Sequence, residues 1–145
     1  MNFSFRFAAC CAYSLFFALG ILLLGCSKAP TPVQWPALKE MDNWAEKGEG
    51  WANEGKIPQM RKNLPDLLAA GDKLLASPIP PNAQDPTAVN LAMGDFKDVM
   101  SHLKNPALSD DELKSQVAAI HPLVAKLLES AGMPHVHEHE EREKK

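Results

Sequence analysis

The sequence predicts an all-α protein whose main domain is an up-down-up-down four-helix bundle. Four segments between residues 35 and 132 carry apolar residues at alternating intervals of three and four, the spacing of helices packed lengthwise on one another. Prolines, glycines and capping residues separate these segments. Because no segment shows the apolar–polar alternation of a half-buried strand, no sheet is expected.

The first helix is expected to begin near Trp35–Pro36, since proline fits the first helical turn. Trp44 and Trp51, seven residues apart, should cover its side. The second helix is expected to open at Pro58 and to end at Ser77–Pro78, with a kink or a break at Pro65. The predicted buried stripes are Leu38, Met41, Ala45, Gly48, Ala52 and Gly55 in the first helix, and Ile57, Met60, Leu64, Leu67, Gly71 and Leu74 in the second.

A long loop over residues 77–85 should precede the third helix, which Asp85 caps and Pro86 opens. Asn105–Pro106 should end it. Ser109 and Glu112 have the spacing of a capping box and mark the start of the fourth helix, which Gly132 and Pro134 end. The predicted stripes are Val89, Ala92, Met93, Phe96, Val99, Met100 and Leu103 in the third helix, and Leu113, Val117, Ile120, Val124, Leu127 and Ala131 in the fourth.

An export signal precedes the bundle. Arg6 is followed by an apolar stretch of 18 residues from Phe7, and Gly25 and Cys26 close it. This arrangement resembles the lipobox of bacterial lipoproteins. The resemblance implies that residues 1–25 are a signal peptide and that Cys26 becomes a lipidated, palmitate-bearing N-terminus. The alternative is an uncleaved transmembrane helix, because 18 residues approach the length that spans a bilayer.

The residues after the signal predict a location in the cell envelope. Residues 26–34 contain Pro30 and Pro32 and read as a semi-rigid tether. By analogy with well-studied lipoproteins, Ser27 after the cysteine favours the outer membrane, with the protein facing the periplasm. Cys10 and Cys11 lie inside the signal, so the mature chain should hold no disulfide. The net charge of -3, with both signs interspersed, offers no basic surface for nucleic acid.

The segment Trp51 to Lys56, the small size and the bundle with a methionine in its first helix and a histidine in its fourth resemble the cytochrome b562 and cytochrome c′ group. The resemblance implies a haem-binding electron carrier with Met41 and His121 as axial ligands. Since Cys-x-x-Cys-His is absent, only non-covalent haem would fit. At about 1.5 Å per residue, however, Met41 lies about 6 Å from the start of its helix and His121 about 15 Å from the end of the antiparallel one, so they should miss each other by roughly two turns.

Residues 133–145 form a tail rich in histidine and glutamate. His135, His137 and His139 alternate with Val136 and Glu138, a pattern in which imidazoles converge on one divalent ion such as Zn, Ni or Cu(II). The alternative is a solvated charged tail without a specific ligand. Met60, Met100 and His102 offer a soft set suited to Cu(I), although both methionines also lie on the predicted apolar stripes.

Outside the tail, only His102 and His121 could serve as general bases near neutral pH, and neither stands in a recognisable nucleophile motif. We therefore expect a non-enzymatic, lipid-anchored envelope bundle that needs no cofactor to fold and handles a divalent transition metal through its tail. The haem electron carrier is one alternative. A structural envelope protein that binds a protein partner is the other.

Overall fold

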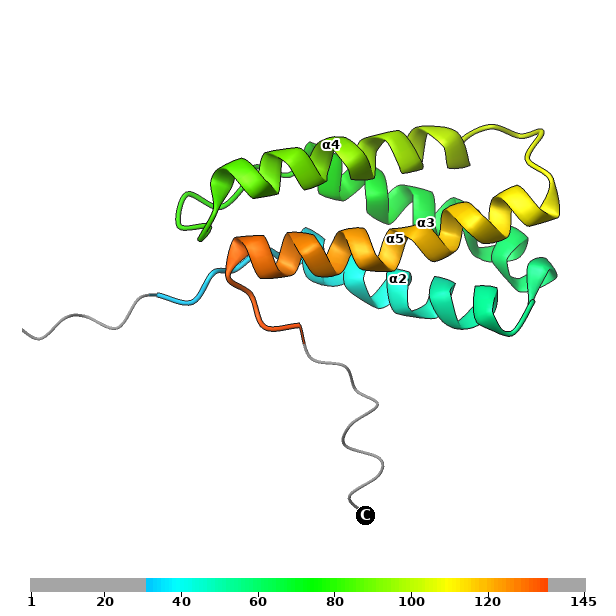
Figure 1. Ribbon diagram of the computed structural model, residues 1–145, viewed down its shortest axis with the longest axis horizontal. Coiled ribbons are helices and arrows are strands. Elements are labelled where there is room, and N and C mark those ends of the chain that lie inside the picture. The colour runs from blue at the N-terminus through cyan, green and yellow to red at the C-terminus, as the bar shows by residue number, and fades with distance from the viewer. Residues whose placement is uncertain (1–30, 136–145) are drawn as a thin grey trace, which may run out of the picture. The chain divides into compact units, whose positions relative to one another are not determined.

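The computed structural model describes residues 31–135, which form four α-helices and no strand within this range (Figure 1). The helices are α2 (Pro36–Asn53), α3 (Ile57–Ala76), α4 (Pro86–Leu103) and α5 (Asp110–Ala131). The all-α prediction is therefore confirmed for this part of the chain. The predicted signal, Cys26 and most of the tether lie outside the described residues. None of the described helices combines the length and the apolar character needed to span a membrane.

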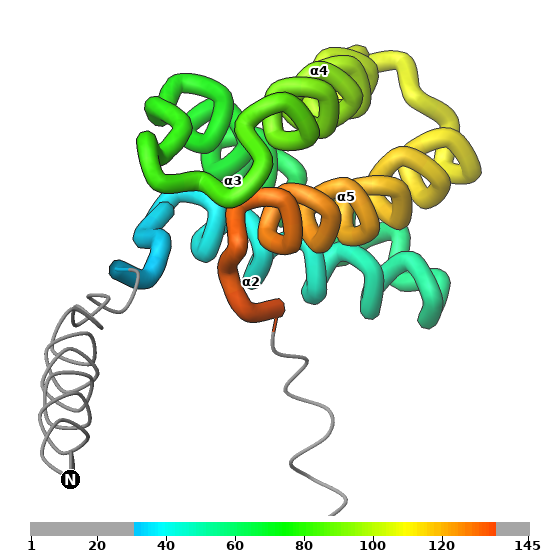
Figure 2. Tube along the Cα trace, turned by 60° about the vertical axis from the view of Figure 1, so that its left-hand side comes forward, coloured from blue at the N-terminus to red at the C-terminus, as the bar shows by residue number. Residues whose placement is uncertain are grey.

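Successive helices run in opposite directions along the bundle, as the colour sequence in Figure 1 shows. Helix α5 packs extensively against both α2 and α4, and α2 packs against α3 (Figure 2). Helix α5 therefore lies between α2 and α4. The up-down-up-down arrangement follows from the short connections on either side of the longer loop at residues 77–85.

The helix ends confirm the capping signals read from the sequence. Asp85 Oδ1 accepts a hydrogen bond from the Ala88 backbone N–H at 2.9 Å. Ser109 Oγ accepts from the Glu112 backbone N–H at 3.3 Å, and Glu112 Oε2 accepts in turn from the Ser109 backbone N–H at 2.9 Å. The Ser109 hydroxyl also donates to Glu112 Oε2 at 2.6 Å, and this bond, together with the one from the Ser109 backbone N–H, lowers the pKa of the Glu112 carboxyl. Gly132 ends α5 in the left-handed conformation, with φ of 77°.

The apolar stripes form a single core, and the fourth stripe is buried over its whole length. Three details differ from the sequence prediction. Gly55 does not extend the first stripe, because it is exposed and lies in the turn after α2 with φ of 67°. Leu128 joins the core beside the predicted Leu127. Helix α3 continues through Pro65 without a break, so that part of the expectation is wrong.

Helices α2 and α5 approach each other closely at Gly48. A Cβ atom added to this glycine would lie 2.8 Å from Val117 Cγ1, so the absence of a side chain allows the contact. At one end of the bundle, the buried Trp35 donates a hydrogen bond from Nε1 to Ser77 Oγ at 2.7 Å. This bond joins the start of α2 to the end of α3. The two contacts fix how α2 sits against its neighbours.

Candidate metal centre

Three polar side chains from three different segments converge beside the core. Asp42 belongs to α2, His121 belongs to α5, and His135 lies on the segment that follows α5. Each offers one ligand atom, and the three atoms lie within 4.8 Å of one another. The side chains of Asp42, His121 and His135 are only 17%, 12% and 16% exposed. The group can therefore hold a metal ion in a largely enclosed position.

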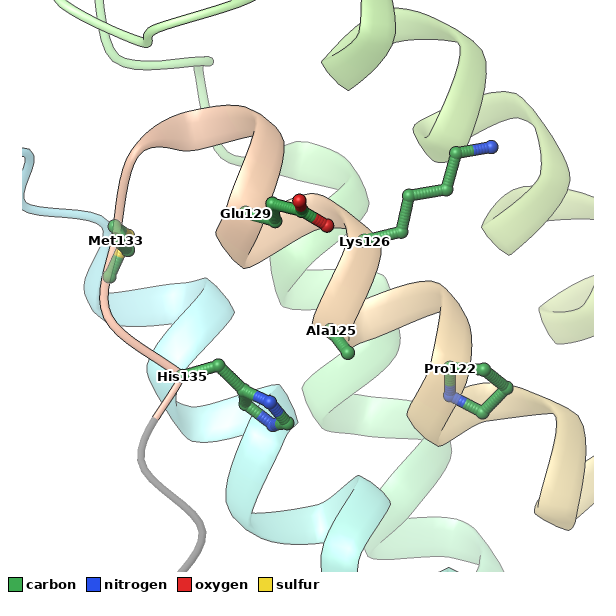
Figure 3. Close-up of a pocket in the computed structure, with 6 residues that line it drawn as sticks. All are labelled: Pro122, Ala125, Lys126, Glu129, Met133 and His135. Atoms are coloured by element: carbon green, nitrogen blue, oxygen red, sulfur yellow. The ribbon is translucent and has the colours of Figure 1, made fainter.

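Local structure brings His135 back to the bundle. Gly132 reverses the chain after α5, and the Met133 backbone N–H donates to the Leu128 carbonyl at 2.9 Å. The Met133 side chain is buried against the core. These contacts hold the segment along the bundle, and Figure 3 shows the His135 side chain directed from it back toward the helices. Asp42 and His121 follow the buried residues Met41 and Ile120, which places both at the edge of the core.

The distances within the group suit metal coordination. His135 Nε2 lies 3.4 Å from Asp42 Oδ1, and the rings of His121 and His135 have centroids 5.3 Å apart. Two ligand atoms on a tetrahedral Zn²⁺ are separated by about 3.3 Å, given metal–ligand bonds of about 2.0–2.1 Å. The Asp42–His135 pair already has this separation. For all three ligand atoms to reach this separation, the side chain of His121 would have to move, or that of His135, whose segment is not helical.

A fourth residue orients one of the imidazoles. Glu49 Oε2 lies 2.7 Å from His121 Nδ1. Histidines that bind metals commonly engage a carboxylate through the nitrogen that does not bind the ion, and this contact fixes the ring. With Nδ1 turned to Glu49, Nε2 is the nitrogen of His121 that a metal would take. Glu49 lies seven residues, or two helical turns, after Asp42, so one face of α2 supplies both carboxylates.

Two imidazoles and one carboxylate form a donor set that Zn²⁺, Ni²⁺ and Cu²⁺ accept. Three protein ligands leave at least one coordination position for water or another molecule, as in zinc sites that bind exogenous ligands. Without a metal, the same side chains form histidine–carboxylate contacts that connect α2 with α5 and with the C-terminal segment. The arrangement is therefore compatible with folding both with and without an ion.

The group corresponds only in part to the residues predicted from the sequence. His135 is common to both, whereas His137 and His139 lie outside the described residues. Sequence reasoning missed Asp42 and Glu49, and it considered His121 as a haem ligand and as a possible general base. The sequence contained only a weak signal for Asp42. This residue directly follows a member of the predicted apolar stripe, and a carboxylate at such a position is held at the edge of the core. Nothing in the sequence indicated that the C-terminal segment folds back onto α2.

The structure also shows where the other ligands predicted from the sequence lie. Met41 is fully buried, and its neighbour Asp42 has a ligand atom within 4.8 Å of that of His121. Met60 and Met100 belong to the core, where Met100 packs directly over Gly71. His102 is exposed on α4, and both methionines are core residues, as their place on the stripes indicated.

A cavity of about 480 Å³ adjoins the group on the α5 side (Figure 3). His135 is part of its wall, so one residue belongs to both features. The other lining residues are Pro122, Ala125, Lys126, Glu129 and Met133. The chain matches no protein-family model, no curated protein and no solved structure.

Proposed function

We propose that this protein is a lipid-anchored helical bundle of the cell envelope that binds a divalent transition metal without an enzymatic role. The observation that carries the proposal is the convergence of Asp42, His121 and His135 to within 4.8 Å in a largely enclosed position. The His121–Glu49 contact supports it, because it orients a ring as metal ligands require. The principal site thus lies against the bundle, and His137 and His139 remain candidate ligands by sequence.

Metal titration of the full chain tests this assignment. After treatment with chelator, calorimetry with Zn²⁺, Ni²⁺ and Cu²⁺ should show binding that His121→Ala removes and that His102→Ala leaves unchanged. His102 is a matched control because it is an exposed histidine on α4. A variant carrying both His137→Ala and His139→Ala should keep a site. If that double variant lost all metal binding while His121→Ala bound metal normally, the metal site would instead lie in the C-terminal tail.

The envelope location is supported by the lipobox resemblance at Gly25–Cys26. Replacement of Cys26 by Ala should abolish incorporation of labelled lipid and release the protein from the membrane fraction. Unchanged lipid labelling would contradict the lipoprotein proposal. Membrane attachment that persists without lipid would instead support an uncleaved apolar helix.

The two alternative functions give different results in the same preparations. A haem carrier with Met41 and His121 as ligands would show a strong visible absorbance band when purified from its own membrane. No haem absorbance is expected from the proposed metal site. If neither haem nor metal is bound above background, an anchored bundle that binds a protein partner becomes the better account.

A further inference from the structure

The ligand atoms of the candidate metal centre are closed to solvent. Asp42 Oδ1, His121 Nε2 and His135 Nε2 are buried, although each of the three side chains keeps some exposed surface. His121 Nε2 is also the nitrogen that the Glu49 contact leaves for an ion. An ion in solution therefore reaches these three atoms only after part of the protein has moved aside.

Two of the three segments that supply ligands are fixed by the core. Asp42 lies within α2 and His121 within α5, and these two helices pack extensively against each other. The residues that precede the two ligands, Met41 and Ile120, have no exposed surface. Moving either helix aside would expose apolar core residues to water, which is costly. The movement that admits an ion must therefore come from the segment that carries His135.

That segment, residues 132–135, is held against the bundle mainly by Met133. It leaves α5 at Gly132, whose φ of 77° turns the chain, and Figure 3 shows it running from the end of α5 toward α2. The Met133 side chain is 8% exposed, and the Met133 backbone N–H donates to the Leu128 carbonyl at 2.9 Å. A rotation at Gly132 would lift His135 away from Asp42 and break these Met133 contacts, while α2 and α5 stay packed.

We infer that residues 132–135 form a strap that closes over the metal ion, and that the ion enters and leaves only when this strap lifts from α2. This inference deepens the proposed function and rests on it, because it states how the site exchanges its ion. Since His135 is itself a ligand, a bound ion holds the strap closed, and the protein retains the ion rather than exchanging it rapidly. A change that loosens the strap must then speed uptake of the ion as well as its release.

Exchange of Co²⁺ by the full chain tests this gating. Uptake of Co²⁺ by the chelator-treated protein and its release into excess EDTA can both be followed in the visible spectrum. Met133→Ala should speed uptake and release together, each by about tenfold, because the loss of about 55 Å² of apolar contact in the docked strap is enough for that factor. Met93→Ala, at a half-buried position on α4, should exchange Co²⁺ at the wild-type rates. Faster release of Co²⁺ from Met133→Ala with unchanged uptake would mean a weakened site that no strap covers, and it would overturn the inference.

A glycine variant provides an independent comparison. At Gly132 a new Cβ would lie 3.0 Å from Gln84 Oε1, and the left-handed backbone there strains a residue with a side chain. Gly132→Ala should therefore loosen the strap and speed both uptake and release, whereas Gly94→Ala, where a new Cβ would meet open space, should change neither. Wild-type rates in either Met133→Ala or Gly132→Ala, with Co²⁺ bound normally, would overturn the inference while the proposed function stands. Failure of Co²⁺ and Zn²⁺ to bind at all would overturn the proposed function, and the inference with it.

Discussion

His135 Nε2 lies 3.4 Å from Asp42 Oδ1, so a residue beyond the last helix contacts the N-terminal half of α2. The contact places the C-terminal segment against the α2–α5 face, where His121 already lies beside Glu49. Because these residues come from three segments, an ion bound among them would connect all three. The bundle itself should fold without the ion, since its apolar core does not include the group.

Glu49→Gln tests the orienting role of this carboxylate. The substitution keeps the shape of the side chain but removes the charge that faces His121 Nδ1, so metal affinity should fall by about 10- to 100-fold. Helical content and thermal stability in chelator should change little. Glu46→Gln on the same helix is the control and should bind metal normally. Unchanged affinity in Glu49→Gln would show that His121 is held in place by other contacts.

The core makes a prediction about stability. Leu67 and Ile120 are buried, so Leu67→Ala and Ile120→Ala should each lower the free energy of unfolding by about 2–5 kcal/mol. Leu91 is 66% exposed, and Leu91→Ala should cost less than about 0.5 kcal/mol. Chemical denaturation in chelator measures all three. A large loss for Leu91→Ala with small losses for the other two would mean that the helices are rotated relative to this structure.

Two glycines of α2 should respond to alanine in opposite ways. At Gly48 a new Cβ would lie 2.8 Å from Val117 Cγ1, and the stiff valine cannot easily move aside. Gly48→Ala should therefore destabilise the protein by about 1–3 kcal/mol. At Gly50 no atom lies within 4 Å of a new Cβ, so Gly50→Ala should stabilise the helix by about 0.5–1 kcal/mol. Thermal melts of the two variants would contradict the α2–α5 packing if both were stabilised.

The capping box at the start of α5 should make stability depend on pH. The pKa of Glu112 is lowered in the folded state because its carboxylate accepts hydrogen bonds from the Ser109 hydroxyl and backbone N–H. Its contribution is therefore present above the usual glutamate pKa and is lost as the pH falls through the lowered value. Ser109→Ala should cost about 1 kcal/mol at neutral pH.

Unfolding of wild type and Ser109→Ala across acidic pH provides the comparison. The difference between the two proteins should shrink as the pH falls, because protonated Glu112 no longer accepts these bonds as a carboxylate. Ser101→Ala, at an exposed position within α4, should show no such dependence. A difference that is constant over the whole pH range would indicate that Glu112 does not take part in the cap.

The sequence predicted the helices well because their signals are local. Pro36, Asp85, Ser109 and Gly132 mark helix ends through backbone geometry and hydrogen bonds within a few residues. The three–four spacing likewise identifies the buried face of each helix. Gly55 was misassigned because it fits this spacing even though it belongs to the turn.

The candidate site was less predictable because it depends on non-local packing. Asp42 meets His135 only after the chain reverses at Gly132 and Met133 packs against the core. A shift of one helix along another changes which residues face each other, and periodicity alone does not fix that shift.

Anomalous X-ray diffraction from crystals of the zinc-loaded protein tests the metal site most directly. We predict a zinc peak about 2.0–2.1 Å from one ring nitrogen each of His121 and His135, and about 2.0–2.2 Å from an Asp42 carboxylate oxygen. The peak should disappear in crystals of His121→Ala. Full zinc occupancy at His137 and His139 alone, with no peak between Asp42 and His121, would contradict the proposed site.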